Sequence, residues 1–567
     1  MQTIVNERYL AKILAFGSFF TTIFVISGGV TDPVNAPKML VIGITGFCAI
    51  AVVVSFNSRK IWTGLKLPII LQVTFLISII FSSLSSSSPV SQLLYGSYGR
   101  NNGALTYLFL SLIYISALTI RHISSFKSII NAMMLAGLVN LIYCLWVIIF
   151  GDFVGWNNPY GNILGTLGNP NFVGAFLGII FSAAFAEIFN NKTAKHRRVI
   201  AGLILPVCGL EIIYSHAIQG RVVAAFGLAL VLFLVVRSKL NKFYLLSYAL
   251  TASTIGALSL AGALQHGPLK GYIYKTSVSL RGQYWLAGWN TGNSHPFTGV
   301  GMDGFGDWYR RMRDVHALEL PGINTVVNTA HNVPIDMFAF GGWPLFLAYL
   351  AIVILTGVRI TQVILRDKRY DPIFATLVVA WAGYQLQSII SINQIGLAVW
   401  GWLLSAVLIA YEVSTRQQNQ LEGDLRVPKK NRQGKQIGFI QPNTLLWSAF
   451  GALMGMVLAL PPLAADMKWR GAQLAGTLPA LEASMENSYF NPPNTMKFAT
   501  NIDTLEQSNL GDLSRKYALV AVKWNPDSFD LWKLLYLLRT STSEEKALAL
   551  QNMKRLDPLN PDVTSIE

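Results

Sequence analysis

The sequence predicts an all-α, polytopic membrane protein with about 13 transmembrane helices, a large outer-face loop and a helical C-terminal tail. Of its 567 residues, 52% are hydrophobic and only 13% are charged, which is too apolar for a soluble chain. Nearly uncharged stretches of about 18 or more residues recur, the length that a helix needs to cross about 30 Å of hydrocarbon. A β-barrel would require alternating segments of about ten residues, whereas these apolar runs are continuous.

The apolar stretches define the predicted spans in order. An odd number of spans places the two termini on opposite sides of the membrane. The first stretch is too long for a removable signal peptide and lacks a convincing small-residue cleavage site. The spans lie near residues 10-28, 38-56, 67-84, 104-120, 128-150, 171-189, 199-215, 222-236, 243-264, 333-357, 372-388, 394-412 and 443-463.

The net charge of +16 does not indicate a nucleic-acid-binding protein, because many basic residues gather in short connectors between the spans. With the N-terminus inside, all these connectors fall on the cytoplasmic face, as the positive-inside rule requires. The basicity is therefore mostly a topology signal. The residues are Arg59 and Lys60; Lys192, Lys195, Arg197 and Arg198; Arg237, Lys239 and Lys242; Arg359, Arg366, Lys368 and Arg369; and Arg416, Arg426, Lys429, Lys430, Arg432 and Lys435.

The same topology places the loops of unusual sequence on the outer face: 85-103, 151-170, 216-221, 265-332 and everything after about 464. Loop 265-332 is long enough to suggest a function, and it combines aromatic residues, glycine and charge. We therefore divide the chain into a transmembrane domain, 1-464, and an extracytoplasmic helical tail, 465-567. The three cysteines, Cys48, Cys144 and Cys208, all fall within spans, so the sequence predicts neither a disulfide framework nor a metal site.

The tail has the pattern of amphipathic helices. Its segments YALVAVKWNPDSFDLWKLLYLL and ALALQNMKRLDPLNPDV carry small residues at helical spacing, close to Asn-Pro or Asp-Pro turns. The step from Pro526 to Pro561 is 35 residues, close to the tetratricopeptide period of about 34. Because helical hairpins in general give a similar pattern, two interpretations stay open, a tetratricopeptide-like tail and an unrelated helical cap.

Three arginines on the predicted outer face are candidates for binding an anionic substrate. Arg100 lies in GSYGRNNGA, Arg221 in SHAIQGRVVAAFG and Arg281 in VSLRGQYWLAG. An arginine at the edge of a span requires a partner or a watery cavity. The planar guanidinium suits phosphate or diphosphate. The alternative for any one of them is that the side chain extends to the lipid headgroups.

Two Asn-containing turns precede predicted spans on the same face. Asn169 and Asn171 flank Pro170 in GTLGNPNFVGAFLG, where their carboxamides could hold hydroxyl or phosphate groups. The alternative is a turn and a helix cap, for which asparagine is well suited. His331 and Asn332 open TAHNVPIDMFAFGGWP. Imidazole can accept a proton near neutral pH, although an isolated histidine here would more often be a hydrogen-bonded boundary residue.

Four segments resemble the O-antigen ligase superfamily of bacterial membrane glycosyltransferases, which includes O-antigen polymerases and pilin O-oligosaccharyltransferases. They are GTLGNPNFVGAFLG, QGRVVAAFG, SLRGQYWLAG leading into HPFTGVGMDGFGDW, and AHNVPIDMFAFGGWPLF. The resemblance spans roughly residues 95 to 412, and His331, Asn332 and Gly342 match the family's His-Asn and later Gly. The chain has Leu345 where the family often has a small residue, and Gln219 and Gly220 where it often has serine before the first arginine.

The resemblance implies an enzyme that transfers a glycan from undecaprenyl diphosphate to an acceptor hydroxyl, with inversion and with neither a metal nor another cofactor. It also implies a bacterial cytoplasmic membrane with the site on the periplasmic face. Arg221 and Arg281 would bind the diphosphate, and His331 would activate or orient the acceptor. Arg100, Asn169, Asn171 and Asn332 are the further candidates for contacting substrate. Independently, the chain has no Asp-x-Asp pair to hold a divalent cation against a nucleotide sugar.

The sequence leaves several functions open. The acceptor could be a lipid A core sugar in a ligase, a second lipid-linked repeat in a polysaccharide polymerase, or a Ser or Thr hydroxyl in a protein O-oligosaccharyltransferase. A transporter or flippase for lipid-linked sugar is an alternative of another class, which predicts a two-fold internal repeat. We see no repeated halves in the sequence. A scaffold that binds partners through its tail would leave the arginines and His331 unexplained.

Overall fold

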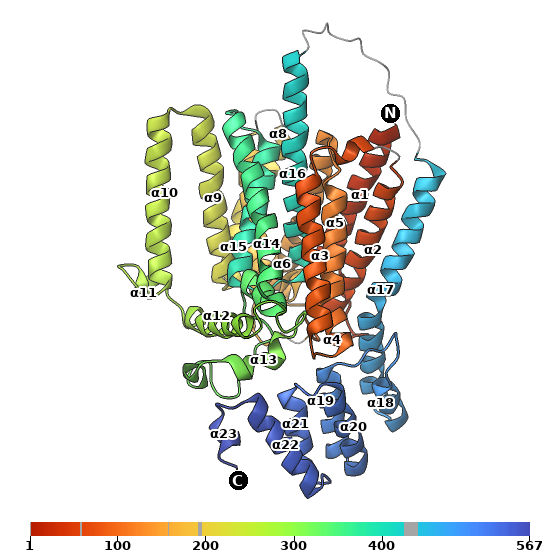
Figure 1. Cartoon of the computed structure of the whole chain (residues 1–567). Coiled ribbons are helices and arrows are strands. Elements are labelled where there is room, and N and C mark those ends of the chain that lie inside the picture. The colour runs from red at the N-terminus through yellow and green to blue at the C-terminus, as the bar shows by residue number, and fades with distance from the viewer. Residues whose placement is uncertain (1, 57–58, 157, 191–194, 425–439, 567) are drawn as a thin grey trace.

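The computed structural model describes residues 2–56, 59–156, 158–190, 195–424 and 440–566. Its described residues form helices and no strand, which confirms the all-α prediction. Every predicted span coincides with one long helix of a single bundle (Figure 1). These helices are α1 (Gln2–Ile23), α2 (Asn35–Val54), α3 (Lys66–Ser85), α5 (Ala104–Ala117), α6 (Ile123–Phe150), α7 (Pro170–Ile188), α8 (Lys195–Tyr214), α9 (Ile218–Lys239), α10 (Lys242–Ala263), α14 (Val333–Arg366), α15 (Pro372–Ile390), α16 (Ile395–Asp424) and α17 (Pro442–Ala475).

Among the described residues, 10 of these helices are long and apolar enough to cross a membrane, namely α2, α3, α6, α7, α9, α10, α14, α15, α16 and α17. The other three predicted spans correspond to α1, α5 and α8, of which α5 is apolar but has only 14 residues. The chain is therefore a multi-pass membrane protein. Short elements lie between the long helices: η1 (Arg59–Trp62), α4 (Val90–Tyr95), η2 (Gly165–Leu167), α11 (Lys270–Ile273), α12 (Thr276–Ser294), α13 (Phe305–Met312) and η3 (Val315–Leu318).

Successive long helices run in opposite directions, so their connectors fall into two sets at the two ends of the bundle (Figure 1). One end holds the N-terminus and the basic connectors. The other end holds α4, α12 and α13 with the loops that carry the candidate site residues, and we call it the loop end. Several residues of the basic connectors lie outside the described residues: Lys192, Arg426, Lys429, Lys430, Arg432 and Lys435.

The burial of the helices follows their place in the bundle. Helix α16 is buried along its whole apolar span and packs against α1, α5, α14 and α15, so it forms the centre. Helix α10 is at the periphery, and its exposed apolar side chains include Leu246, Leu250 and Ile255. A membrane offers such side chains an apolar surrounding without the cost of contact with water.

The tail is a compact helical unit with its own core. It comprises α18 (Leu478–Met485), α19 (Thr495–Gln507), α20 (Gly511–Trp524), α21 (Phe529–Leu537), α22 (Ser543–Leu556) and α23 (Pro561–Thr564). Phe498, Leu505, Trp532 and Leu556 belong to its core. The division we placed at 464 falls inside α17, which continues without a break to Ala475, so the last span leads directly into the tail.

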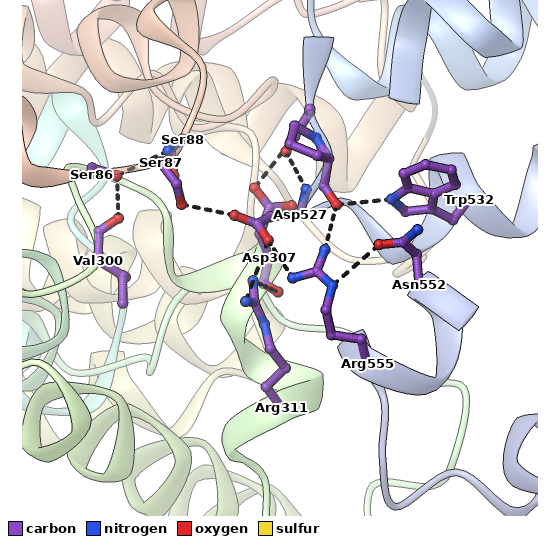
Figure 2. Close-up of polar contacts among 12 residues, drawn as sticks. Ser86, Ser87, Ser88, Val300, Asp307, Arg311, Asp527, Trp532, Asn552 and Arg555 are labelled. Atoms are coloured by element: carbon purple, nitrogen blue, oxygen red, sulfur yellow. Dashed lines mark hydrogen bonds and ion pairs between the residues drawn. The ribbon is translucent and has the colours of Figure 1, made fainter. Parts of the chain in front are cut away.

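The tail docks on the long loop through buried ion pairs. The Asp557 carboxylate accepts hydrogen bonds from Arg310 at 2.9 Å and Arg313 at 2.7 Å, and the Arg313 and Asp557 side chains are fully buried. A second carboxylate, Asp527, lies between Arg311 of α13 and Arg555 of α22, at 3.4 and 3.1 Å (Figure 2). Charges buried this deeply are stable only when paired, so these contacts fix α13 against the tail.

Asp527 also ties the tail to the start of the α3–α4 connector. The Ser87 hydroxyl donates to the Asp527 carboxylate at 2.8 Å, and the neighbouring Ser86 hydroxyl donates to the Val300 carbonyl at 2.7 Å (Figure 2). One end of the tail thus contacts both the 85-103 connector and the 265-332 loop, the two segments that supply Arg100 and Arg281.

Candidate functional site

Helix α14, which follows His331, is kinked at Gly341 and Gly342. Gly342 has φ 62° and ψ −160°, a conformation that is open essentially to glycine alone. A Cβ atom there would lie 2.3 Å from the carbonyl oxygen of Pro296. That carbonyl accepts the N–H of Trp343 at 2.7 Å. The match of Gly342 to the family pattern therefore has a physical reason, the close approach of the long loop to the helix.

The kink frees backbone carbonyls of α14, and the loop satisfies them. The N–H groups of Val300 and Gly301 donate to the carbonyls of Ala339 and Phe340, each at 3.0 Å. The Ser82 hydroxyl of α3 also donates to Phe340, at 2.5 Å. Unpaired backbone groups are costly in a membrane protein, so these bonds fasten the loop to the first part of α14.

Helix α12 packs against this first part of α14 through two small residues four apart. A Cβ atom on Gly288 would lie 2.6 Å from the Ile335 side chain, and one on Gly292 would lie 2.2 Å from the Phe338 ring. Small residues at this spacing allow two helices to approach closely. Because Arg281 is about two turns before Gly288 on α12, this contact sets the position of Arg281 relative to the start of α14.

His331 lies in the turn before α14, with its ring half-buried. Its φ of 56° is left-handed, which is uncommon for a residue other than glycine. The ring packs on Tyr284 of α12, with centroids 5.4 Å apart and planes inclined by 34°. The next residue, Asn332, is buried and caps α14 by accepting the Ile335 N–H at 3.0 Å. Asn332 thus has a structural role whether or not it contacts substrate.

The positive charges of Arg100 and Arg281 both act on His331. Burial lowers the pKa of the His331 imidazole, and the two guanidinium groups lower it further. The Arg281 side chain is itself largely buried, and its Nε has no hydrogen-bond partner among the described residues. The site therefore combines an imidazole that favours its neutral form with two guanidinium groups.

Two buried carboxylates hold the segments that carry Arg100 and His331. The Asp303 carboxylate accepts the N–H of Ser97 at 2.6 Å, and burial raises the pKa of Asp303. The Asp336 carboxylate accepts the N–H of Ala330 at 2.7 Å, directly before His331. Burial lowers the pKa of the Arg100 guanidinium, and the interactions with Asp303 and Asp336 oppose that shift, so the two carboxyl groups favour a cation at this end of the bundle.

The remaining predicted residues lie at the loop end but do not all join this group. Arg221 is in the first turn of α9 with an exposed side chain, and no hydrogen bond or ion pair ties it to another described residue. Asn169 caps α7 by accepting the Asn171 N–H at 2.9 Å, and its amide donates to the Tyr160 hydroxyl at 3.2 Å. The helix-cap interpretation thus describes Asn169 and the Asn171 backbone, while the Asn171 side chain has no bonded partner among the described residues.

A cavity of about 470 Å³ opens beside Arg100. Its walls come from four connectors of the loop end and from the lower part of α17. Cavities of this size hold small molecules in other proteins. Asn169 lines it as well. The other polar and aromatic lining residues are Asp32, Asn35, Asn102, Trp156, Asn393, Gln394 and Arg470.

Sequence reasoning missed several residues of this site. Tyr284 was not singled out, although its place one turn after Arg281 in LRGQYW put it on the same helix face. No role was predicted for Asp303, although it lies in HPFTGVGMDGFGDW, one of the segments that carry the resemblance. No local signal indicated Gln394 or Arg470, because they reach the cavity through the packing of helices far apart in the sequence.

Comparison with known protein families gives a match. A family model described as O-Antigen ligase matches residues 172–350. The matched segment contains Arg221, Arg281, His331 and Asn332, whereas Arg100, Asn169 and the tail lie outside it. A search of curated proteins finds no match.

Proposed function

Residues 172–350 belong to the O-antigen ligase family, and from this premise we propose that the protein transfers a glycan from undecaprenyl diphosphate to an acceptor hydroxyl. The reaction would take place at the outer face of the bacterial cytoplasmic membrane, where the loop end would lie. The observation that carries the proposal is the grouping of His331 with Arg100 and Arg281, because it joins a proton acceptor to groups that bind diphosphate.

The proposed chemistry assigns a role to each group. His331 accepts the proton of the acceptor hydroxyl while that oxygen attacks the anomeric carbon of the glycan. The bond from this carbon to the diphosphate oxygen breaks, and its electrons leave with undecaprenyl diphosphate, so the configuration inverts. Arg281 and Arg100 bind the diphosphate and stabilise its developing charge, and Arg221, exposed in the first turn of α9, is the further arginine that the resemblance assigns to it. Because diphosphate is already a good leaving group, alignment and charge stabilisation suffice, and no metal is required.

The glycan acceptor is the second part of the proposal. We favour ligase-like transfer to a sugar hydroxyl, with polysaccharide polymerisation and protein O-glycosylation as alternatives of the same chemistry. The ion-paired tail lies against both loops that supply arginines, which suits a unit that presents an acceptor to the site.

The test uses the purified chain in detergent with a glycan on undecaprenyl diphosphate, a panel of sugar, lipid-linked and peptide acceptors, and EDTA. We expect transfer to one acceptor class with chelator present. Tight binding of the lipid donor without transfer to any acceptor would instead favour a carrier or flippase.

Gly292 provides a test of the packing that positions Arg281. Gly292→Val is expected to lower the transfer rate by about tenfold to 10²-fold, because displacing a catalytic group by about 1 Å can cost that much. A side chain at Gly292 must move the Phe338 ring. The matched control on the same helix is Gly282→Ala, since nothing lies within 4 Å of an added Cβ there. Equal rates for the two variants would contradict the role of the α12–α14 contact.

The pH dependence tests the state of His331. Its pKa is lowered from the ordinary value of about 6.5, so the imidazole stays neutral as the pH falls through that value. We expect kcat/KM to show no acid limb near pH 6.5. In Arg100→Gln, a positive charge that opposes protonation is removed, so any acid limb should move to higher pH. An acid limb that moves to lower pH would contradict the electrostatic assignment.

A further inference from the structure

Three residues that line the cavity beside Arg100 each have a buried polar atom with no hydrogen-bond partner among the described residues. These atoms are Oδ2 of Asp32, Oδ1 of Asn102 and Nε2 of Gln394. The three residues are only 7%, 3% and 3% exposed. Leaving such atoms unpaired is costly, so a ligand that pairs with them would be bound favourably.

The other atoms of these side chains hold them in place. The Oδ1 of Asp32 accepts the N–H groups of Val34 and Asn35 at 3.0 and 3.1 Å. The Oε1 of Gln394 accepts the N–H of Leu397 at 3.2 Å. Asp32 and Gln394 thus keep their unpaired atoms in a fixed place, which is what a preorganised binding site needs.

Asn393, also in the cavity wall, shows the contrast. Its Oδ1 accepts from the Tyr384 hydroxyl at 2.9 Å, and its Nδ2 donates to the Tyr107 hydroxyl at 3.0 Å. Both ends of this amide are used within the protein. Only some of the polar side chains in the cavity wall therefore have an unpaired atom.

The wall also includes groups from α17 and from the α6–α7 connector. The Asp466 carboxylate accepts the N–H groups of Thr31 and Asp32 at 2.8 and 2.9 Å, so α17 holds the α1–α2 connector. One turn later, Arg470 reaches the cavity as a second guanidinium besides Arg100. Trp156 adds an aromatic ring.

We propose that this cavity binds a sugar unit of the glycan substrate. Two free acceptors and one free donor match sugar hydroxyls, which both donate and accept. The aromatic ring offers an apolar face for the C–H side of a sugar, as aromatic residues do in ligand pockets. Arg100 lines this cavity and its charge also acts on His331, so it can contact the phosphate attached to the sugar. This assignment rests on the proposed function, since it names the part of the substrate that the cavity holds.

The experiment measures sugar binding directly, without turnover. The full chain in nanodiscs is mixed with methyl glycosides of glucose, galactose, mannose, rhamnose, N-acetylglucosamine and N-acetylgalactosamine, and binding is followed by saturation-transfer NMR. Asn102→Leu and Gln394→Met are each expected to lower the affinity for the bound glycoside at least tenfold. The affinity of both variants for undecaprenyl diphosphate without a glycan, measured by native mass spectrometry, should stay within twofold of the wild-type affinity.

The matched control is Gln387→Met. Gln387 is 1% exposed and its Nε2 also has no partner in the described chain, but it does not line the cavity. The affinity of Gln387→Met for the glycoside should stay within twofold of the wild-type affinity. Trp156→Ala, in a connector, gives a second variant that leaves the buried amides intact, and it too should weaken binding.

Three results would overturn the assignment: no glycoside binds to wild type, binding is unchanged in Asn102→Leu and Gln394→Met, or inorganic diphosphate alone displaces every signal. Failure of the proposed function is a separate outcome. If glycosides bind in a Gln394-dependent way but no glycan is transferred, the sugar site stands and the transfer reaction does not.

Discussion

His331→Asn is expected to lower the rate of glycan transfer by about 10²–10⁴-fold, the contribution typical of a positioned general base. Asparagine removes the proton acceptor. Among residues other than glycine, it tolerates a left-handed backbone well, as the φ of 56° at this position requires. The variant should therefore fold as wild type does, and the loss should fall on kcat rather than on the binding of the lipid donor. Transfer is measured with radiolabelled glycan, and folding by thermal unfolding in the same detergent.

His331→Ala serves as the comparison, because alanine removes the same ring but does not favour the left-handed conformation. Similar rates in the two variants would assign the loss to the missing imidazole. A folded His331→Asn variant that turns over at the wild-type rate would exclude the proposed base.

Arg281 can be examined in the same assay. Arg281→Ala is expected to abolish transfer, and Arg281→Lys should restore little, because a lysine keeps the charge but not the planar fork that binds two phosphate oxygens. Full activity in Arg281→Ala would contradict the proposed role in diphosphate binding.

The sequence predicted the helices far better than it predicted the site. A continuous apolar run predicts a span whatever the helix packs against. The sequence therefore predicted both α2, which packs against α17, and α16, which is buried at the centre of the bundle. The direction of each span followed from its order in the chain. These features depend on local composition, which a single sequence contains.

The site depends on contacts between distant segments. His331 could be proposed from the sequence because its residue type and its place before a span are local features. Tyr284, which packs on its ring, became visible only when α12 was placed against α14. Asn169 and Asn332 both cap helices in the structure. An asparagine before a helix predicts a cap whether or not the residue also contacts substrate, so the sequence alone does not distinguish the two roles.

In the proposed function the tail presents the acceptor, and its buried ion pairs suggest a physical route from the tail to the site. Helix α13 carries Tyr309, whose ring is 6.2 Å from that of Tyr284, and Tyr284 packs on His331. The same helix and its C-terminal end carry Arg310 and Arg313, which pair with Asp557. A change at Asp557 can therefore reach the imidazole through α13 and the two tyrosines.

Asp557→Ala is expected to destabilise the docked tail by about 3–5 kcal/mol, because it leaves the buried charges of Arg310 and Arg313 without their carboxylate partner. Limited proteolysis should then cleave the 265-332 loop or the tail at a protease concentration that leaves wild type intact. The rate of transfer should fall as well, while the Kd for undecaprenyl diphosphate changes less.

The control for this variant is Asp530→Ala, which removes another carboxylate near the same arginine. Asp530 is 58% exposed and lies 3.7 Å from Arg310, so its loss should cost less than about 1 kcal/mol. Deleting 465-567 is a blunter test, because it also removes Arg470 from the cavity wall and Asp466 from its bond to the α1–α2 connector. If Asp557→Ala resists proteolysis as Asp530→Ala does and transfers glycan at the wild-type rate, then the tail does not act on the site through α13.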